Sequence, residues 1–417
     1  MFASSISTNS ISGGAGGVIL IEPQITLTGS GTMSTIAANS AGAAISLQNV
    51  LADNLQTLVL LSGTSSIDVG SLGSSSYPIG AVSLTGDAIR LNGPVTAAGS
   101  NGSLSISNSG DLHIESGDVA LSGSFLQQGI GDVFLGNNIT ADGGPLSFQS
   151  LIQLTADTKL TALKDLILSS NVLGESPVAL TLESIDESIS VGQLGTSSYP
   201  LGNVTFIASN TSSLGGIVTE NGDIDIGPPI LLTSLLTVLD TTAGTGSVSF
   251  QNTVDAADEG SSSEALQVSA GASSVTFSGA LGGSFPLGGV AVSSTGGLTI
   301  GGNISTTSSS TSSLAGAVQI QAPVTLSGDS QVDTTKGGSG AAITFTGAIN
   351  GDQSFALAAG PALITLSSDI GASVPLQSFA ILSASGVAIQ SVTVVDAIFI
   401  SSHITLSEMP LTTFTSQ

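Results

Sequence analysis

Cysteine and tryptophan are absent from the 417-residue sequence, and charged residues make up only 8% of it. An ordinary soluble domain carries roughly 25% charged residues, so ordinary globular packing is doubtful. The absence of cysteine excludes disulfides and thiolate metal sites. Aromatic residues make up 4% of the chain, too few to centre one large core. We therefore expect many small, similar cores instead.

Positive charge is also scarce, with 4 basic residues against 29 acidic ones and a net charge of -25. Binding to nucleic acid depends on neutralising phosphates, so this chain is not expected to bind DNA or RNA. Anionic membrane surfaces are excluded as partners for the same reason. The acidic excess is instead expected to keep an otherwise apolar and hydroxyl-rich surface soluble.

Long apolar runs are missing, because stretches such as Ile230 to Leu236 are interrupted by Thr and Ser. A membrane-spanning helix needs about 18 apolar residues, so no membrane insertion is expected. Residues 1–17 lack the charge and the apolar stretch of a signal peptide. If the protein is secreted, we expect its signal outside this chain, as in an internal fragment. Disorder is disfavoured by a mean hydropathy of +0.48.

The most frequent pattern is a tripeptide with two apolar residues around a small polar one. It occurs at Ile25-Thr26-Leu27, Ile45-Ser46-Leu47, Leu104-Ser105-Ile106, Val204-Thr205-Phe206, Val248-Ser249-Phe250 and Ile343-Thr344-Phe345. Such alternation is typical of short strands with one buried face. Turn residues, as in Asn221-Gly222-Asp223, lie between the strands. The sequence therefore predicts an all-β fold with frequent corners.

The spacing of the tripeptides indicates how the strands are arranged. Apolar pairs begin at Ile67, Val82, Ile89, Leu104, Leu112, Val119 and Val133, in steps of about 7 or 15 residues. This predicts coils of about 20–22 residues with roughly three short strands each. Antiparallel hairpins are less consistent with it, since they favour longer strands and two-residue turns. The general crossover rule makes the predicted parallel β-helix right-handed.

We expect one continuous β-helix over residues 1–417. At a strand spacing of about 4.8 Å, some 19 coils would extend about 90 Å. Exposed terminal coils would be open edges, so end-to-end contacts with flanking coils are expected there. The stretch from Ala156 to Leu168 could be helical, but Leu166 and Leu168 still alternate, and we predict strand.

A longer repeat is superimposed on the coils. Gly70 to Val82 reads GSLGSSSYPIGAV and Gly192 to Val204 reads GQLGTSSYPLGNV, while GALGGSFPLGGV and DIGASVPLQSF are further copies. The loop-bearing copies lie near residues 67–95, 189–230, 275–304 and 364–392. Their aligned prolines are Pro78, Pro200, Pro286 and Pro375. Separations near whole numbers of coils predict that every copy lies on the same side of the solenoid.

The aromatic position of this repeat has two interpretations. Tyr77, Tyr199 and Phe285 are expected to tuck against the coil, with proline fixing the return into the next strand. The fourth copy has Val374 there, which keeps apolarity and discards the hydroxyl. The alternative is that the two tyrosines face outward and stack on a ligand.

The Gly-x-Leu-Gly-x-Ser-Tyr/Phe-Pro-Leu/Ile-Gly motif, repeated across Ile67 to Ile389, resembles the β-strand repeats of filamentous-haemagglutinin-like exoproteins and autotransporter passengers. The resemblance covers about three quarters of the chain. It implies a β-helix on the bacterial cell surface, used for adhesion to host or neighbouring cells. Neither the secretion domain nor the membrane barrel of such proteins is recognisable, so the export route stays open between the two-partner and autotransporter types.

Many β-helices act on polysaccharides as lyases or hydrolases, so an enzyme of either type is the alternative function. Two carboxylates facing one cleft are required for glycoside hydrolysis. The candidates are Asp223 with Asp225, the group of Glu183, Asp186 and Glu187, and the group of Asp255, Asp258 and Glu259. We interpret them as solvated outward residues, because aromatic platforms and cationic partners are scarce. No catalytic residue is predicted.

Cofactor and metal sites are not predicted either. His113 and His403 lie far apart in the sequence, and His113 alternates with apolar neighbours as an outward residue would. Gly-Asp pairs do not form the calcium nonapeptide. The aspartates of these pairs are Asp87, Asp111, Asp118, Asp132 and Asp223. A phosphate-binding loop is absent, since residues 13–17 lack the lysine and the following helix.

A third function class is ice binding, which uses regular ranks of outward Thr. The central residues of the tripeptides vary too much for a matched lattice, so this class ranks below adhesion. The sequence therefore predicts a non-catalytic adhesive segment that makes weak, multivalent contacts with cell-surface proteins or glycans.

Overall fold

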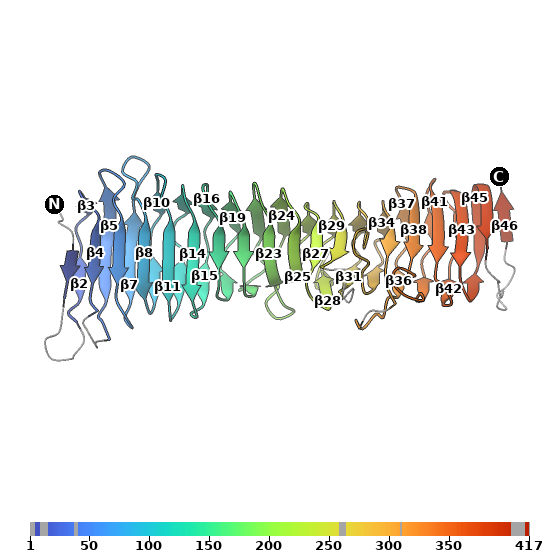
Figure 1. Ribbon diagram of the computed structural model, residues 1–417, viewed down its shortest axis with the longest axis horizontal. Coiled ribbons are helices and arrows are strands. Elements are labelled where there is room, and N and C mark those ends of the chain that lie inside the picture. The colour runs from blue at the N-terminus through green and yellow to red at the C-terminus, as the bar shows by residue number, and fades with distance from the viewer. Residues whose placement is uncertain are drawn as a thin grey trace. The chain divides into compact units, whose positions relative to one another are not determined.

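The computed structural model describes residues 5–8, 16–36, 41–257, 264–308, 311–401 and 413–416. All regular structure in these ranges is β-strand, and the strands pair in parallel ladders (Figure 1). The chain is a parallel β-solenoid of about 16 turns. The predicted all-β solenoid is confirmed, while its right-handedness stays a prediction.

The chain divides into two compact units. The first comprises Met1–Leu201 and Ile207–Asn210, and the second comprises Gly202–Phe206 and Thr211–Gln417. Strand β24 (Val204–Ala208) contains residues of both.

Each strand of the first unit pairs with a strand about one coil further along the chain. One ladder contains β1 (Ser5–Ser7), β4 (Gly31–Ser34), β6 (Leu58–Leu61), β8 (Val82–Gly86), β11 (Leu104–Asn108), β14 (Phe125–Gly129), β17 (Leu146–Phe148), β20 (Leu166–Leu168) and β23 (Ile189–Leu194). Another contains β2 (Ile19–Ile21), β5 (Ile45–Ala52), β7 (Ile67–Leu72), β9 (Ile89–Leu91), β12 (Leu112–Ile114), β15 (Val133–Leu135), β18 (Ile152–Leu154) and β21 (Val172–Gly174). A further ladder joins β3 (Ile25–Leu27), β5, β7, β10 (Val95–Ala97), β13 (Val119–Leu121), β16 (Ile139–Ala141), β19 (Thr158–Ala162) and β22 (Leu180–Ser184).

Three strands of this unit, β5, β7 and β23, bend across a corner and belong to two ladders. The number of strands per coil therefore varies, and three per coil stays a prediction. Residues 156–168 are strands β19 and β20, so the prediction of strand over helix is confirmed there.

The second unit is built in the same way. One ladder contains β26 (Ile224–Ile226), β29 (Val248–Phe250), β32 (Val275–Phe277), β34 (Leu298–Ile300), β37 (Val324–Leu326) and β40 (Ile349–Asn350). Another contains β25 (Ser212–Val218), β28 (Leu236–Asp240), β31 (Ala265–Gly271), β33 (Val290–Ser294), β36 (Val318–Gln321), β39 (Ile343–Phe345), β42 (Leu363–Leu366) and β44 (Gly386–Ile389). The remaining strands are β27 (Ile230–Leu232), β30 (Val254–Ala256), β35 (Ile304–Ser305), β38 (Ser330–Asp333), β41 (Ser354–Ala358), β43 (Leu376–Ser383), β45 (Ser391–Ile400) and β46 (Thr413–Ser416).

The length of a coil varies along the chain. In the N-terminal coils of the first unit, aligned residues advance by 26 positions from Ile19 to Ile45 and by 27 from Gly31 to Leu58. Along the ladder from β8 to β23, aligned residues advance by 22, 21, 21, 20 and 23 positions. From β26 to β40 they advance by 24, 27, 23, 26 and 25 positions. Along the first of these two ladders, the predicted 20–22 residues per coil therefore hold only from β8 to β20. Longer coils at the N-terminal end and in the second unit explain why about 16 turns replace the predicted 19.

The interior of each unit is filled by aligned aliphatic side chains, with local pairs of phenylalanine rings. Phe125 and Phe148 lie with ring centroids 4.8 Å apart, and Phe250 and Phe277 lie 5.7 Å apart. All four rings are fully buried. Each buried aliphatic or aromatic side chain contributes about 1.5–3 kcal/mol, so stability is spread over the stack.

Polar side chains also point inward, at a corner of the first unit. Gln127 is fully buried, and its Nε2 donates to Asn108 Oδ1 at 2.8 Å and to Ser150 Oγ at 3.1 Å. Its Oε1 accepts from the amides of Gln149 and Ser150 at 2.9 and 3.2 Å. Buried polar groups need partners, and this network supplies them across three coils.

Candidate functional site

The four repeat copies form one common loop. A glycine with φ between 67° and 71° begins each loop, and its amide donates to a carbonyl one coil earlier at 2.7 Å. The glycines are Gly73, Gly195, Gly282 and Gly371. Two buried aliphatic residues flank each loop. These pairs are Leu72 and Ile79, Leu194 and Leu201, Leu281 and Leu287, and Ile370 and Leu376.

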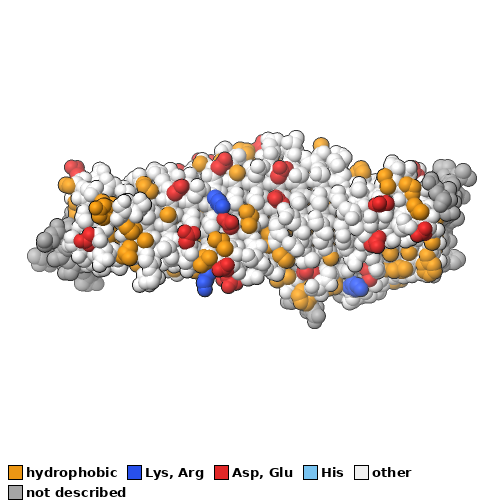
Figure 2. All heavy atoms as spheres, turned by 90° about the horizontal axis from the view of Figure 1, so that it is seen from above, with side chains coloured by type: hydrophobic (Ala, Val, Ile, Leu, Met, Phe, Trp, Pro, Cys, Tyr) orange, Lys and Arg blue, Asp and Glu red, His pale blue; other side chains and the backbone are white. Residues whose placement is uncertain are grey.

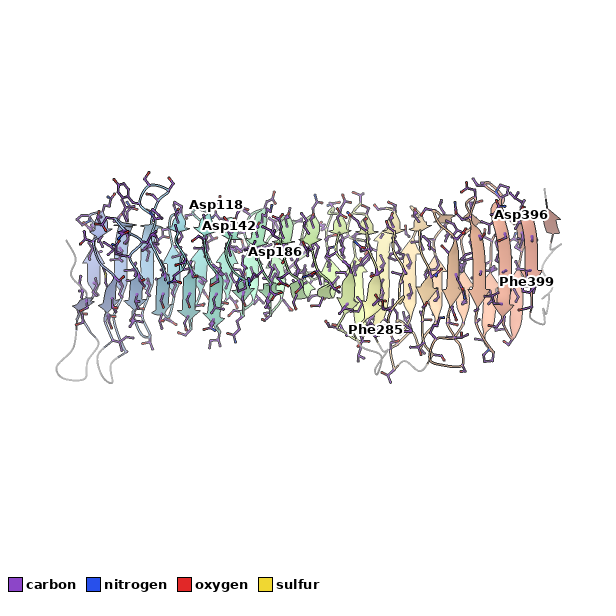
Figure 3. All side chains as sticks on the ribbon, turned by 45° about the horizontal axis from the view of Figure 1, so that its top comes forward. Asp118, Asp142, Asp186, Phe285, Asp396 and Phe399 are labelled. Atoms are coloured by element: carbon purple, nitrogen blue, oxygen red, sulfur yellow. The ribbon has the colours of Figure 1, made fainter. Side chains whose placement is uncertain are left out.

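The aromatic residue of the loop does not anchor it through its ring. Tyr77 and Tyr199 are 51% and 54% exposed, so the prediction that they tuck against the coil is wrong. Their carbonyls accept from Ala52 and Gly174 at 3.5 Å, one coil earlier. The aliphatic residue after the proline provides the buried anchor instead. Phe285 is half-buried on its loop (Figure 3), and Val374 is exposed.

The copies do not share one side of their unit. Leu72 pairs with Val95 in the ladder of β10, whereas Leu194 pairs with Val172 in the ladder of β21. In the second unit, Leu281 bridges to Val254, while Ile370 bridges to Ile349 of a different ladder. The prediction of a common side is therefore wrong, because the separations are not whole numbers of coils.

The carboxylates of the enzyme alternative hold neighbouring coils together. Asp223 Oδ1 accepts from the amide and hydroxyl of Ser247 at 2.7 and 2.8 Å. Asp225 Oδ1 accepts from Gln251 Nε2 at 2.9 Å. Both aspartates point away from buried Ile224, as predicted. Each carboxylate therefore accepts a hydrogen bond from a residue one coil further along the chain.

Among the other candidates, the group of Glu183, Asp186 and Glu187 does not converge on a metal site either. Glu183 forms an ion pair with Lys159 at 2.8 Å, while Asp186 and Glu187 are exposed. Asp255 is only 7% exposed, and its Oδ1 accepts from the amides of Ser284 and Phe285 at 2.8 and 3.3 Å. Residues 258 and 259 of that group, Asp258 and Glu259, lie outside the described residues.

This contact recurs at many corners. We call it the coil clamp: an Asp or Asn side-chain oxygen that accepts from the backbone amide of a residue 20 to 29 positions later. Further clamps join Asn49 to Ser71, Asp118 to Asn138, Asn138 to Lys159, Asp157 to Ala179, Asn203 to Asp223, Asn303 to Gln331, Asp329 to Ser354 and Asn350 to Ser373. Many corner carboxylates and amides therefore have a structural use.

His113 lies outward on β12, as predicted. Its ring stacks on Phe134 with centroids 4.6 Å apart and an angle of 8° between the planes. Its Nδ1 lies 2.8 Å from Glu115 Oε2. Because the two rings cover each other's faces, they do not offer a free platform on that side. His403 lies outside the described residues.

Acidic side chains do not gather into a metal site within the described ranges. Asp118, Asp142 and Asp186 are exposed and follow one another along the first unit (Figure 3). On the face shown in Figure 2, acidic side chains are spread along the surface, and some of them lie beside basic side chains. No helix among the described residues could span a membrane.

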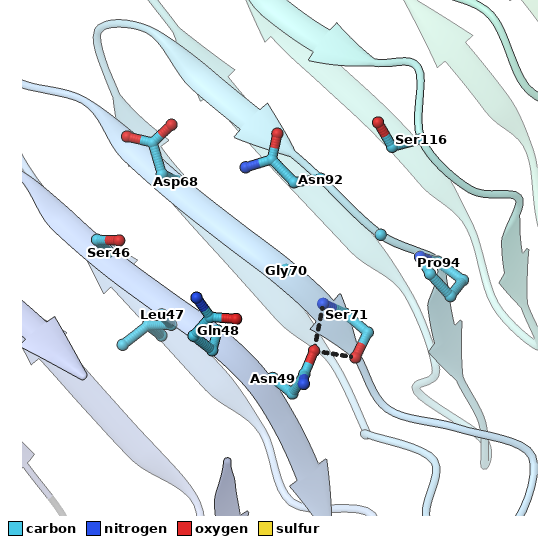
Figure 4. A pocket seen from close by; sticks show the side chains of 11 residues that line it. Ser46, Leu47, Gln48, Asn49, Asp68, Gly70, Ser71, Asn92, Pro94 and Ser116 are labelled. Atoms are coloured by element: carbon cyan, nitrogen blue, oxygen red, sulfur yellow. Dashed lines mark hydrogen bonds between the residues drawn. The ribbon is translucent and has the colours of Figure 1, made fainter. Parts of the chain in front are cut away.

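A polar groove of about 550 Å³ lies on the first unit (Figure 4). Four successive coils line it. The lining residues are Ser46, Leu47, Gln48, Asn49, Asp68, Gly70, Ser71, Asn92, Gly93, Pro94 and Ser116. Asn49 Oδ1 accepts from the amide and hydroxyl of Ser71 at 3.2 and 2.8 Å, which fixes this side of the groove.

Two glycines line the groove where successive coils lie close together. A Cβ on Gly70 would approach Gln48 O to 1.7 Å, and one on Gly93 would lie 3.1 Å from the backbone of Gly70 and Ser71. The coils approach closely here, so a side chain at Gly70 would clash with the backbone of the preceding coil, and one at Gly93 would be tight. Sequence reasoning missed this groove. The available signal was glycine one coil apart at equivalent positions, beside Gln48 and Asn92.

No family model, curated protein or solved structure matches the chain. The solenoid fold is what the resemblance to filamentous-haemagglutinin-like exoproteins implied, and that part is confirmed. Membership of that family stays a prediction.

Proposed function

We propose that the chain is a non-catalytic structural and adhesive segment of a secreted or surface-exposed bacterial exoprotein of the filamentous-haemagglutinin-like type. Its partners would be proteins or glycans on host or neighbouring cells. The proposed right-handed winding is the usual one for parallel crossovers.

One observation carries the proposal: the side chains best suited to acid-base chemistry bind the next coil. Asp223 and Asp255 each accept backbone amides at 2.7–2.8 Å. A carboxylate used in this way stabilises stacking. The surface left for partners is largely uncharged and hydroxyl-bearing, which favours weak contacts repeated many times.

The test is adhesion of beads coated with the purified chain to cultured host cells and to bacterial cells. We expect coated beads to bind, and excess soluble chain to compete, whereas heat-denatured chain should not. Equal binding by uncoated beads would overturn the proposal. So would turnover of a polysaccharide by the chain that disappears in the Asp223→Asn and Asp225→Asn variants.

A further inference from the structure

The polar groove of the first unit offers hydrogen-bonding groups of a particular kind. Gln48 and Asn92 are exposed, and each carboxamide carries one acceptor oxygen and two donor hydrogens. The hydroxyls of Ser46 and Ser116 add groups that both donate and accept. A ligand matched to this lining must itself both donate and accept many hydrogen bonds.

The charge of the groove lining and of the chain restricts the class of ligand further. Among the lining residues Asp68 is the only charged one, and there is neither lysine nor arginine. With a net charge of -25 on the chain, sulfated or uronate-rich polymers would be repelled. Apolar ligands are poorly matched as well, because Leu47 is buried and the rest of the rim is mostly polar.

The length of the groove favours a linear oligosaccharide over a single sugar ring as the ligand. Its lining crosses four coils, from Ser46 to Ser116. At a strand spacing of about 4.8 Å these levels cover about 14 Å. Gly70 and Gly93 add no side chain to the lining, so a linear ligand meets none at these two positions.

We propose that this groove binds a segment of a neutral, hydroxyl-rich or N-acetylated polysaccharide. The inference rests on the proposed adhesive function and names the chemical class of its partner. No aromatic ring lines the groove, so each site is expected to bind weakly. Adhesion then depends on many copies acting together.

The test uses the full chain and three defined probes: chitotetraose, cellotetraose and tetragalacturonate. Binding is measured by saturation-transfer NMR and equilibrium dialysis. We expect saturable binding of at least one neutral tetramer and at least tenfold weaker binding of tetragalacturonate. The Gln48→Ala, Asn92→Ala double variant should lose at least tenfold in affinity.

The matched control is Gln128→Ala with Asn101→Ala, two exposed residues of the same unit outside the groove. It should bind like the unchanged chain. The proposal is overturned if neither neutral tetramer binds, if the groove variant binds as well as the control, or if tetragalacturonate binds equally.

Bead adhesion, measured in parallel, separates this inference from the proposed function. Adhesion without tetramer binding would reject the groove ligand and leave the adhesive function standing. Tetramer binding without adhesion would support the groove and reject the adhesive function. Circular dichroism of both variants shows whether the fold is kept, because a folded groove variant is required for the comparison.

Discussion

Asp223 lies one coil before Ser247, and its carboxylate accepts both the backbone amide and the hydroxyl of that serine at 2.7 and 2.8 Å. The same arrangement joins Asp165 to Ser188, with hydrogen bonds at 3.4 and 2.8 Å. Such a clamp fixes the register of successive coils at a corner, where the strand ladder is interrupted. The acidic residues of this chain therefore contribute to stacking as well as to solubility.

The clamp at Asp223 predicts a difference between neighbouring aspartates. Asp223→Ala should lower the free energy of unfolding by about 1 kcal/mol, because that is the typical net contribution of one hydrogen bond to stability. Asp225→Ala should cost less, since it loses only the contact with the Gln251 side chain. Urea unfolding followed by circular dichroism measures both. Equal losses would contradict a role for the clamp.

The buried amide of Gln127 gives a second prediction. Gln127→Leu leaves Asn108 Oδ1 and two amides without partners, and should destabilise the chain by about 3 kcal/mol. Gln128→Leu on the exposed face should change stability by less than about 0.5 kcal/mol. The same urea titration compares them. A tolerated Gln127→Leu would show that the corner does not need its polar network.

The alternation of the sequence predicted the strands and the fold, because inward aliphatic residues recur at nearly constant advance. The same alternation places Gln127 inward, two residues after Phe125. Its burial was not predicted, because a polar side chain is usually expected to face solvent. Tyr77 was misplaced because a loop residue has no strand period to fix its direction. The groove depends on how closely Gly70 approaches the coil before it, which spacing alone does not give.

Thr237 and Thr241 are buried threonines whose replacement by valine is expected to change stability in opposite directions. Thr237 Oγ1 has no hydrogen-bond partner, whereas Thr241 Oγ1 donates to Gly246 O at 2.5 Å. Replacing a buried unpaired hydroxyl by a methyl group removes a desolvation cost, so Thr237→Val should stabilise the chain by about 1 kcal/mol. Thr241→Val should destabilise it. Melting temperatures of the two variants moving in the same direction would refute this.

The surroundings of Asp333 predict that the stability of the folded chain depends on pH. Its burial favours the neutral form, but the hydrogen bonds from the Thr335 hydroxyl at 2.6 Å and amide at 2.9 Å, with Lys336 beside it, outweigh burial and lower the pKa of the carboxyl. A lowered pKa stabilises the folded chain above the ordinary value of about 3.9. That stabilisation is lost as the pH falls through the folded-state pKa.

Asp333→Asn should therefore be less stable than the unchanged chain at pH 6, and the difference should shrink progressively below about pH 4. Thr335→Val removes the hydroxyl donor and should weaken the same dependence. Urea titrations at a series of pH values measure it. A difference that stays constant down to pH 2.5 would exclude the assigned cause.

The loop glycines give the last prediction. Gly73 has a φ of 71°, and a Cβ there would lie 2.2 Å from Thr96 O of the next coil. Gly73→Ala combines left-handed backbone strain of about 1–2 kcal/mol with a clash against backbone that cannot move without breaking the Ile79 hydrogen bond to Thr96. Gly29→Ala is the matched control, since nothing lies within 4 Å of its Cβ.

We expect Gly73→Ala to lower the unfolding free energy by more than about 2 kcal/mol and Gly29→Ala to leave it unchanged or slightly higher. Hydrogen exchange adds a local measurement, because the strained loop should expose the amide of Ile79 while distant coils stay protected. If both variants were equally stable, the positive φ and the close approach would not be what selects glycine. The repeated motif would then need a reason outside the loop, such as contact with a partner through exposed Tyr77.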